Sequence, residues 1–162
     1  MPHATLTHFD QNGNSIMVDV TQKQKTKRTA IATGTIAMSS ECYAAIEEGN
    51  IKKGDVLNIA RIAGIMATKK TPELIPLCHN IPIEKVSLDF TKNNKDNTIT
   101  ATCTVSTTGK TGVEMEALTG VNISLLTIYD MCKAIDKHMT IQHIYLQEKQ
   151  GGKSGKFERP LR

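Results

Sequence analysis

The stretch Thr98–Ser106 reads TITATCTVS and alternates strictly between apolar and hydroxyl-bearing side chains. A period of two residues is that of a β-strand with one buried and one exposed face. The stretch Lys85–Phe90 alternates in the same way, and residues 93–97 between the two are typical of a hairpin loop. One apolar and one polar face in each strand predict an antiparallel sheet that is covered on one side only.

The segments on either side of this hairpin complete the predicted fold. Strands are predicted over residues 29–38 and 141–147, where apolar side chains alternate with others. Capping residues and helical spacing predict helices over residues 41–48, 55–69 and 116–137. Without the first short helix, the order is β-α-β-β-α-β. The sequence therefore predicts an α+β fold of the ferredoxin-like kind, an antiparallel sheet with helices packed on one face.

The helix predicted over residues 116–137 carries apolar side chains on two faces. Its main stripe recurs every three or four residues and is expected to cover the sheet. The stripe consists of Leu118, Val121, Leu125, Ile128, Cys132 and Ile135. At about 100° per residue, Ile123 and Leu126 fall on the far side, near Asp130. Because a monomer would expose Ile123 and Leu126 to water, the sequence predicts a second subunit against this helix.

Length and composition predict a single domain over residues 1–162. The chain has 39% hydrophobic and 22% charged residues, as in an ordinary water-soluble domain. We expect about residues 1–27 to form either a mobile arm or a segment that covers a ligand, and we expect a mobile tail, rich in glycine and lysine, over about residues 149–162. The chain contains no secretory signal and no apolar run long enough to cross a bilayer, so we expect a cytoplasmic protein without a membrane partner.

Charge and side-chain types limit the partners. The formal net charge is only +4, which favours a small anionic ligand over nucleic acid. Aromatic residues make up 4% of the chain and Trp is absent, whereas proteins that stack on bases depend on aromatic side chains. The four cysteines form no Cys-x-x-Cys pair, which predicts buried free thiols and no metal site.

Two short segments carry residues that bind or catalyse, and each has a structural alternative. His79 can bind a ligand or transfer a proton near neutral pH, although a lone histidine is more often structural. We do not expect Cys78 to be a nucleophile activated by His79, because neighbouring side chains in an extended chain point to opposite sides. The segment Gly151–Gly155 is similar to part of a P-loop, but Gln147 stands where that motif has glycine. It is either a solvated tail or a segment that supplies amide donors and a cation to a phosphate.

Charged residues lie at both ends of the long helix. Glu114 and Glu116 at its start either complement the helix dipole or accept hydrogen bonds from a guanine-like edge. Asp130 and Lys133 near its end share one face. They form either a surface ion pair or a proton-transfer pair. A neighbouring carboxylate raises the pKa of a lysine whereas partial burial lowers it, so the pKa of Lys133 could be adjusted in either direction.

Seven short motifs occur in order and cover nearly the whole chain, from Met17 to Gly155. They are Met17–Val20, Lys53–Leu57, Ala60–Ile65, Leu74–His79, Thr111–Thr119, Tyr129–Ala134 and Gly151–Gly155. Together they closely resemble the molybdenum cofactor biosynthesis protein C family, the cyclic pyranopterin monophosphate synthases. One departure is Asn80, where the family usually has proline after the histidine.

The resemblance implies an activity. Members of this family act on 3′,8-cyclo-7,8-dihydro-GTP, rearrange its rings to a pyranopterin, form a cyclic phosphate and release diphosphate. The resemblance thus implies a lyase of molybdopterin synthesis that requires no cofactor, and it leaves open whether Mg²⁺ accompanies the triphosphate. It also implies a homohexamer, a trimer of dimers with active sites at a subunit interface, which agrees with the two apolar faces of the long helix.

The resemblance also assigns roles to residues. It places the active-site acid at Asp130 and proton-transferring lysines at Lys133 and Lys53. It places substrate-binding and pocket positions at Leu77, Cys78, His79, Met115, Glu116, Glu114 and Asp19. From their charge and the position of the tail in the family, the residues expected to bind the triphosphate are Arg28, Lys149 and Lys153. We expect Lys53, Asp130 and Lys133 to converge in one pocket with His79.

Two other classes of protein remain as alternatives. A noncatalytic RNA-binding module can share the ferredoxin-like fold, but it usually displays aromatic side chains on its sheet for stacking. A structural subunit of an assembly needs only the two apolar helix faces. The clustered Lys, Asp, Glu and His motifs argue against that second alternative.

Overall fold

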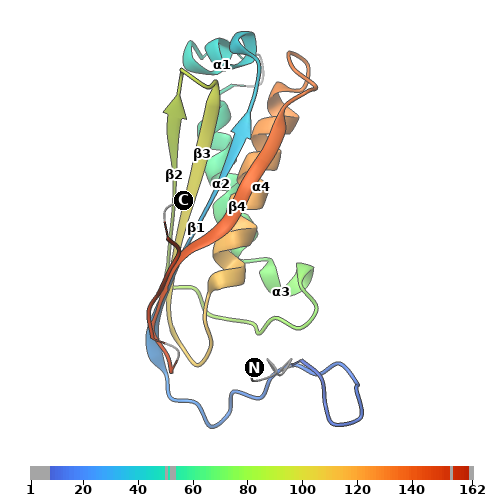
Figure 1. Ribbon diagram of the computed structural model, residues 1–162, viewed down its shortest axis with the longest axis vertical. Coiled ribbons are helices and arrows are strands. Elements are labelled where there is room, and N and C mark those ends of the chain that lie inside the picture. Colours follow the sequence, from blue (N-terminus) through green and yellow to red (C-terminus); the bar gives the residue numbers. More distant parts are fainter. Residues whose placement is uncertain (1–7, 50, 52–53, 154, 161–162) are drawn as a thin grey trace.

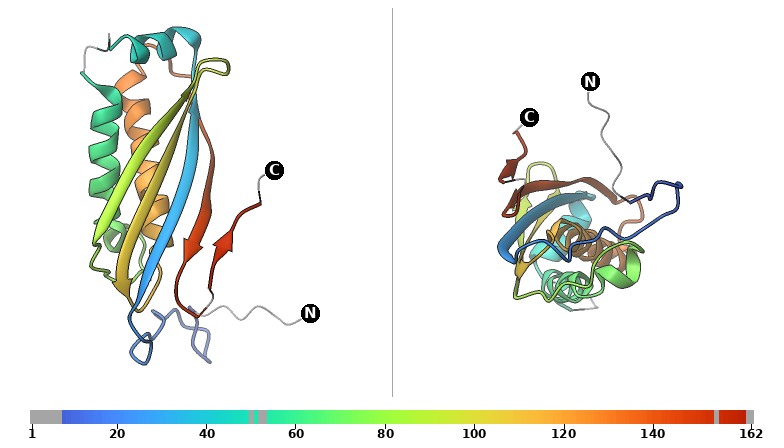
Figure 2. Two further views of the ribbon diagram at one scale, coloured as in Figure 1. Left: turned by 90° about the vertical axis from the view of Figure 1, so that its left-hand side faces the viewer. Right: turned by 90° about the horizontal axis from the view of Figure 1, so that it is seen from below.

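The sheet consists of five antiparallel strands. They are β1 (Thr26–Ala37), β2 (Lys85–Asn93), β3 (Thr98–Gly109), β4 (Thr140–Gln150) and β5 (Phe157–Glu158). The helices are α1 (Ser40–Glu47), α2 (Val56–Thr68), α3 (Thr71–Leu74) and α4 (Glu114–Cys132). The computed structural model describes residues 8–49, 51, 54–153 and 155–160. The strand order is β2-β3-β1-β4-β5, and α2 and α4 cover one face of the sheet (Figure 1 and Figure 2).

The burial of β3 confirms the alternation that decides the fold. Ile99, Ala101, Cys103 and Val105 are fully buried, while the residues between them are only partly buried. β3 pairs with β1 on one side and with β2 on the other, and β1 pairs with β4. The order β2-β3-β1-β4 is that of the split β-α-β arrangement, so the predicted α+β fold with helices on one face is confirmed.

Two glycines let α2 and α4 pack closely. A Cβ atom built on Gly64 of α2 would lie 2.8 Å from the carbonyl oxygen of Gly120 on α4. A Cβ atom built on Gly120 would lie 2.7 Å from Sγ of Cys103, on the buried face of β3. The absence of side chains at Gly64 and Gly120 therefore sets how closely the two helices approach each other and the sheet.

Gly64→Ala should lower the free energy of unfolding by about 2 kcal/mol, because overpacking outweighs the gain of about 1 kcal/mol in helix propensity. Urea denaturation followed by circular dichroism measures the loss. Asn58→Ala, at an exposed position of the same helix, is the matched control and should change stability by no more than about 0.5 kcal/mol. If Gly64→Ala were as stable as the wild type, this account of the helix packing would be wrong.

Helix α4 is shorter than predicted. It ends at Cys132 rather than near residue 137. The carboxylate of Asp136 accepts hydrogen bonds of 2.8 Å from the backbone N–H groups of Ser39 and His138, and the first of these ties the turn after α4 to the start of α1. These hydrogen bonds lower the pKa of Asp136 below its ordinary value. The turn that follows Lys133 is thus fixed by a tertiary contact.

Part of the predicted tail belongs to the sheet. β4 continues to Gln150, and β5 pairs with it so that Lys149 lies opposite Phe157. The backbone N–H of Arg159 donates a hydrogen bond of 2.8 Å to the carbonyl oxygen of Gln147. The chain therefore turns back after Gln150 and returns along the edge of β4.

Several apolar side chains on the helices remain exposed in a single chain. Ile59, Ile62 and Met66 of α2 are 41%, 52% and 61% exposed, and Leu126 of α4 is 53% exposed. Leu126 lies on the helix face for which the sequence predicts a second subunit. None of the helices in the described part of the chain is long and apolar enough to span a membrane.

Candidate active site

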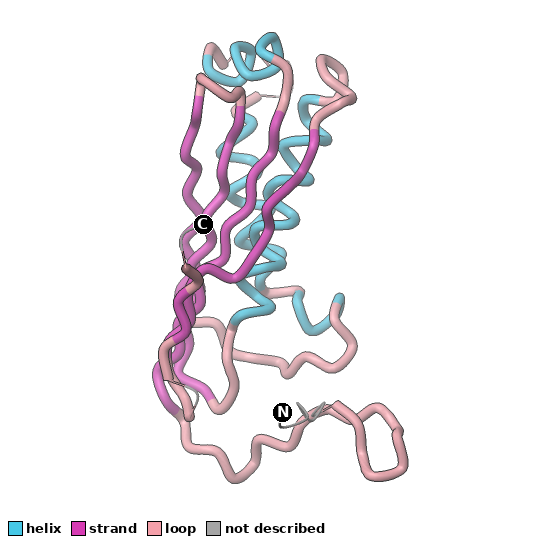
Figure 3. The backbone as a smooth tube through the Cα atoms, in the orientation of Figure 1, coloured by secondary structure: helices cyan, strands magenta, loops and turns pink. Residues whose placement is uncertain are grey.

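A cavity of about 320 Å³ lies at the end of the molecule where α4 begins. The loop before β1 and the loop between α3 and β2 both run past this end (Figure 3). Six of the predicted substrate-binding residues line the cavity, which we call the His79 cavity. They are Leu77, Cys78, His79, Glu114, Met115 and Glu116. These residues come from two motifs, in which His79 and Glu114 are 35 positions apart in the chain, and the two motifs meet in the fold.

A second cavity, of about 650 Å³, adjoins the first, because Lys23 lines both. Three basic side chains line this second space, which we call the Arg28 cavity: Lys23, Arg28 and Lys153. The backbone of Gly152 lies beside them. Cationic side chains around one cavity attract anions, and guanidinium and ammonium groups form strong hydrogen bonds with phosphate oxygens.

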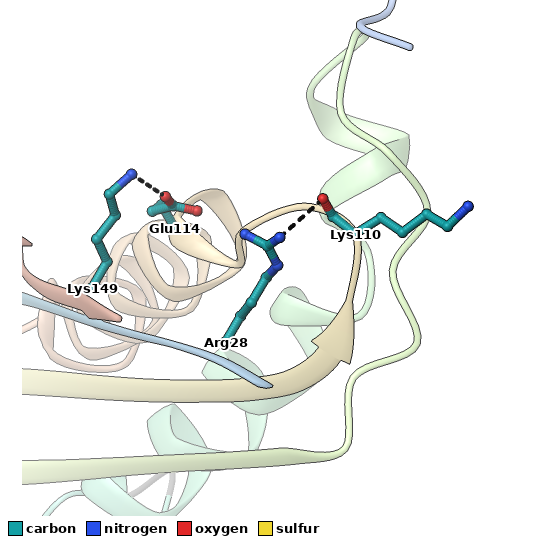
Figure 4. A network of polar contacts seen from close by, with 4 residues as sticks. All are labelled: Arg28, Lys110, Glu114 and Lys149. Atoms are coloured by element: carbon teal, nitrogen blue, oxygen red, sulfur yellow. Dashed lines mark hydrogen bonds and ion pairs between the residues drawn. The ribbon is translucent and has the colours of Figure 1, made fainter. Parts of the chain in front are cut away.

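The guanidinium group of Arg28 is held by the backbone around it. Its Nε donates a hydrogen bond of 2.9 Å to the carbonyl oxygen of Gly109, and its Nη2 donates one of 3.2 Å to that of Lys110 (Figure 4). Gly152 passes so close to the guanidinium that a Cβ atom on it would collide with Nη1. Since an arginine side chain has five N–H donors, these two hydrogen bonds orient the group and leave further donors to bind an anion.

Lys149 lies outside the Arg28 cavity, unlike the other two cations that the sequence predicts for the triphosphate. Its Nζ forms an ion pair of 3.0 Å with Oε1 of Glu114, which links β4 to the first turn of α4 (Figure 4). The two side chains are only 29% and 27% exposed, so the pair is partly shielded from water. The contact fixes the position of Glu114 at the edge of the His79 cavity.

His79 holds the N-terminal loop against the body of the protein. Its Nε2 lies 2.7 Å from the carbonyl oxygen of Val18. Because a carbonyl oxygen only accepts hydrogen bonds, Nε2 is the nitrogen that donates here. Nζ of Lys110 donates a hydrogen bond of 2.6 Å to the carbonyl oxygen of Thr21 and fixes the same loop a little further along.

Asp19 lies in this loop but lines neither cavity, although Val18 and Val20 on either side of it line the His79 cavity. Its carboxylate accepts hydrogen bonds from the hydroxyl and the backbone N–H of Thr21. These hydrogen bonds lower the pKa of Asp19. In a single chain, Asp19 therefore shapes the loop rather than the cavity wall.

The carboxyl group of Glu116 is buried in the wall of the His79 cavity, with the residue only 2% exposed. Burial is the main cause that raises the pKa of Glu116 to about 7, and the charge of Glu114 contributes in the same direction. Burial, together with the charge of Glu116, also raises the pKa of the Cys78 thiol. At neutral pH the cavity thus contains a protonated thiol and a carboxyl group that readily exchanges its proton.

We expect the wild-type protein to lose stability relative to the Glu116→Gln variant as the pH rises from about 5 to about 7.5. The raised pKa means that the folded protein keeps the proton on Glu116 at pH values at which the unfolded chain has released it. The loss of stability begins near pH 4.5, the ordinary pKa of a glutamate. It is complete once the pH has passed about 7, the pKa of Glu116 in the folded protein. Urea titrations of both proteins across this range measure it. A difference in stability that does not change with pH would contradict a raised pKa at this position.

Asp130 and Lys133 form a second cluster, at the other end of α4. Nζ of Lys133 donates a hydrogen bond of 2.7 Å to Oδ1 of Asp130. The side chain of Lys133 is 54% exposed and that of Asp130 is 59% exposed. This hydrogen bond and the charge of Asp130 raise the pKa of Lys133, so the lysine is an ammonium ion at neutral pH. The third predicted catalytic residue, Lys53, lies outside the residues that the structure describes.

A single chain does not bring the two clusters together. Glu114 and Asp130 are 16 residues apart on α4, which at about 1.5 Å per residue places them about 24 Å apart. Figure 1 shows the start of α4 near α3 and its other end toward α1. Within one chain, Asp130 and Lys133 therefore do not share a pocket with His79, and their convergence stays a prediction for the assembled subunits. The two clusters can meet only across a contact between two chains.

Two titratable residues of the His79 cavity, Lys23 and His8, were not among the predicted site residues. Lys23 belongs to the basic segment before β1, and its charge is the signal that could have pointed to it. His8 has no comparable signal, because only the folded path of the N-terminal loop places it there. Within the described ranges, no three His, Cys, Asp or Glu side chains gather in a way that could hold a metal ion.

Residues 17–152 match the MoaC family. A cyclic pyranopterin monophosphate synthase of Clostridium perfringens (strain 13 / Type A) is 58% identical over 152 residues, which cover 94% of this chain and 96% of that protein. The synthase of Limosilactobacillus fermentum is 58% identical over 94% of this chain and 92% of its own length. That of Pelobacter propionicus is 55% identical over 94% of this chain and 95% of its own length. The chain therefore belongs to the MoaC family of molybdenum cofactor biosynthesis enzymes, the cyclic pyranopterin monophosphate synthases.

Proposed function

We propose that the protein converts 3′,8-cyclo-7,8-dihydro-GTP into cyclic pyranopterin monophosphate and diphosphate. The observation that carries this proposal is the pair of adjoining cavities that share Lys23, one lined by titratable side chains and the other by cations. A nucleoside triphosphate has two matching parts, a heterocycle with hydrogen-bonding edges and a chain of phosphates. Membership of the MoaC family supports the choice of this cyclic substrate.

The Arg28 cavity binds the triphosphate in this proposal. Arg28, Lys23 and Lys153 all line it, and the backbone holds the guanidinium of Arg28 in one orientation. A preorganised guanidinium stabilises phosphate oxygens without first losing side-chain freedom. Lys149 acts at one remove, because its ion pair with Glu114 holds a residue that lines the His79 cavity.

The His79 cavity receives the guanine-derived rings. Among the described residues that line it, none is Phe, Tyr or Trp, so the rings are held by hydrogen bonds and by the apolar side chains of Leu77 and Met115 rather than by stacking. His79 and Glu116 offer polar atoms to the edges of the rings. The low aromatic content of the chain fits this mode of binding.

Asp130 and Lys133 of a second subunit complete the site. In a twofold-symmetric dimer each contact occurs twice, so the start of one α4 can face the end of its partner at two equivalent places. The exposed apolar side chains of α2 and Leu126 of α4 support burial against other subunits. We propose that such dimers assemble into a homohexamer, a trimer of dimers.

The reaction requires proton transfers and a phosphoryl transfer. Lys133 as an ammonium ion donates a proton, and Asp130 and Glu116 accept or return protons while the rings open and close again. In the second part, a ribose hydroxyl gives its proton to one of these carboxylates, and its oxygen forms a bond to the α-phosphorus while the bond from that phosphorus to the oxygen of the β-phosphate breaks. The diphosphate leaves with additional negative charge, which Arg28 and the neighbouring lysines stabilise.

The proposal includes no cofactor held by the protein. A Mg²⁺ ion that takes part enters as a companion of the triphosphate, since Mg²⁺ is commonly bound through substrate phosphates. We propose that the reaction takes place in the cytoplasm, where a thiol such as that of Cys78 stays reduced.

Incubating the purified protein with 3′,8-cyclo-7,8-dihydro-GTP tests the proposed function. Mass spectrometry and a coupled diphosphate assay should find the cyclic pyranopterin and diphosphate in equal amounts. GTP is the matched control substrate and should release no diphosphate, because it lacks the bond between C3′ and C8. If the cyclic substrate were recovered unchanged, the proposed function would be wrong.

A further inference from the structure

We infer that His8 is an additional substrate-binding residue of the His79 cavity. It lines this cavity together with Cys78, His79 and Glu116, although it lies 70 to 108 positions before them in the chain. Because His8 would touch the substrate of the proposed reaction, this assignment rests on the proposed function.

A small hairpin of the N-terminal loop carries His8 to the cavity. The backbone N–H of Ile16 donates a hydrogen bond of 2.9 Å to the carbonyl oxygen of His8. The next pair, Phe9 and Ser15, forms an antiparallel β-bridge. His8 and Ile16 are thus held side by side at the open end of the hairpin.

The tip of this hairpin is closed by its own side chains. Oδ1 of Asp10 accepts hydrogen bonds from the backbone N–H groups of Asn12 and Asn14, at 2.9 and 2.8 Å. Gly13 supplies the left-handed backbone conformation that this turn requires, with φ of +81°. The turn is therefore a locally determined structure and not an arbitrary path of the chain.

The open end of the hairpin is anchored to the cavity wall. Val18, two residues after Ile16, accepts the hydrogen bond from Nε2 of His79. The anchor at Val18 and the hydrogen bond between Ile16 and His8 together limit where the imidazole of His8 can lie. One histidine of the cavity thus positions the segment that carries the other.

The chemistry of the two imidazoles differs in a way that favours a ligand at His8. His79 commits one ring nitrogen to the carbonyl oxygen of Val18. The ring of His8, by contrast, forms no hydrogen bond with any other residue of the described ranges. A neutral imidazole offers one donor and one acceptor, which suits the amide-like edge of a guanine-derived ring.

The test measures the affinity for GTP by titration calorimetry and the KM for the cyclic substrate. In His8→Ala, the Kd for GTP and the KM for the cyclic substrate should each rise about tenfold. This is the usual effect of removing one hydrogen bond to a ligand. His8→Gln, which keeps a donor and an acceptor, should recover part of the loss. Phe9→Ala is the matched control, since Phe9 is 49% exposed, neighbours His8 and does not line the His79 cavity.

Unchanged binding and unchanged KM in His8→Ala would overturn the assignment. Equal losses in His8→Ala and Phe9→Ala would overturn it as well, because they would show an effect of the hairpin and not of the imidazole. Binding of GTP also separates this inference from the proposed function. If wild-type protein bound GTP but did not convert the cyclic substrate, the proposed function would fail while the loss of GTP affinity in His8→Ala would still support a contact from His8.

Discussion

Replacing Lys133 with alanine should lower kcat by about 1,000-fold or more, in the range found when a general acid or base is removed. Lys133 is 54% exposed, and its hydrogen bond of 2.7 Å is to the equally accessible Asp130. Its removal therefore leaves no buried charge and no core cavity, and the fold should remain intact. We expect the loss to fall on kcat, because the role proposed for the ammonium group is proton transfer rather than binding of the phosphates.

Diphosphate release under saturating substrate measures this effect, and circular dichroism checks the fold. Lys137→Ala is the matched control, because Lys137 is an exposed lysine only four positions further along the chain. It should keep nearly full activity. Turnover by Lys133→Ala at a rate near that of the wild type would show that Lys133 has no catalytic role.

Arg28→Ala should lower kcat/KM by about 100-fold, because it removes a preorganised donor from the phosphate site. The hydrogen bonds to the carbonyl oxygens of Gly109 and Lys110 fix the guanidinium at the cavity that we assign to the triphosphate. Arg28→Lys should lie between the wild type and Arg28→Ala, since a lysine keeps the charge but not the fork of N–H groups.

Steady-state kinetics with the cyclic substrate measures this second effect. Lys27→Ala is the matched control, because Lys27 is the preceding residue of β1 but lines neither the His79 cavity nor the Arg28 cavity. A decrease of the same size in Lys27→Ala and Arg28→Ala would indicate a general effect of positive charge. It would argue against a specific contact from Arg28.

The fold could be predicted well where the deciding signal is local. The alternation in Thr98–Ser106 has the period of a strand, and the structure buries the predicted face of β3. The end of α4 could not be predicted, because it depends on a hydrogen bond between Asp136 and Ser39, which are 97 positions apart. The pairing of β5 with β4 is a tertiary contact of the same kind.

The site could be predicted only in part. Two motifs named six residues that line the His79 cavity, but no pattern indicated His8, whose position depends on a hairpin closed by Asp10. The predicted convergence of Asp130 with His79 stays a prediction that requires two subunits, for a physical reason that the sequence already contained. A straight helix from Glu114 to Cys132 must separate its two ends, so residues at those ends cannot share one pocket within one chain.

Mixing the two inactive variants tests most directly whether the active site is built from two subunits. Lys133→Ala retains the Arg28 cavity, and Arg28→Ala retains the cluster of Asp130 and Lys133. In a dimer of one variant with the other, one site contains both substitutions and the other site contains neither. Variants with different affinity tags, coexpressed in equal amounts and combined at random, should therefore recover about one quarter of the wild-type activity. If purified mixed oligomers were no more active than either variant alone, the site would not be shared between subunits.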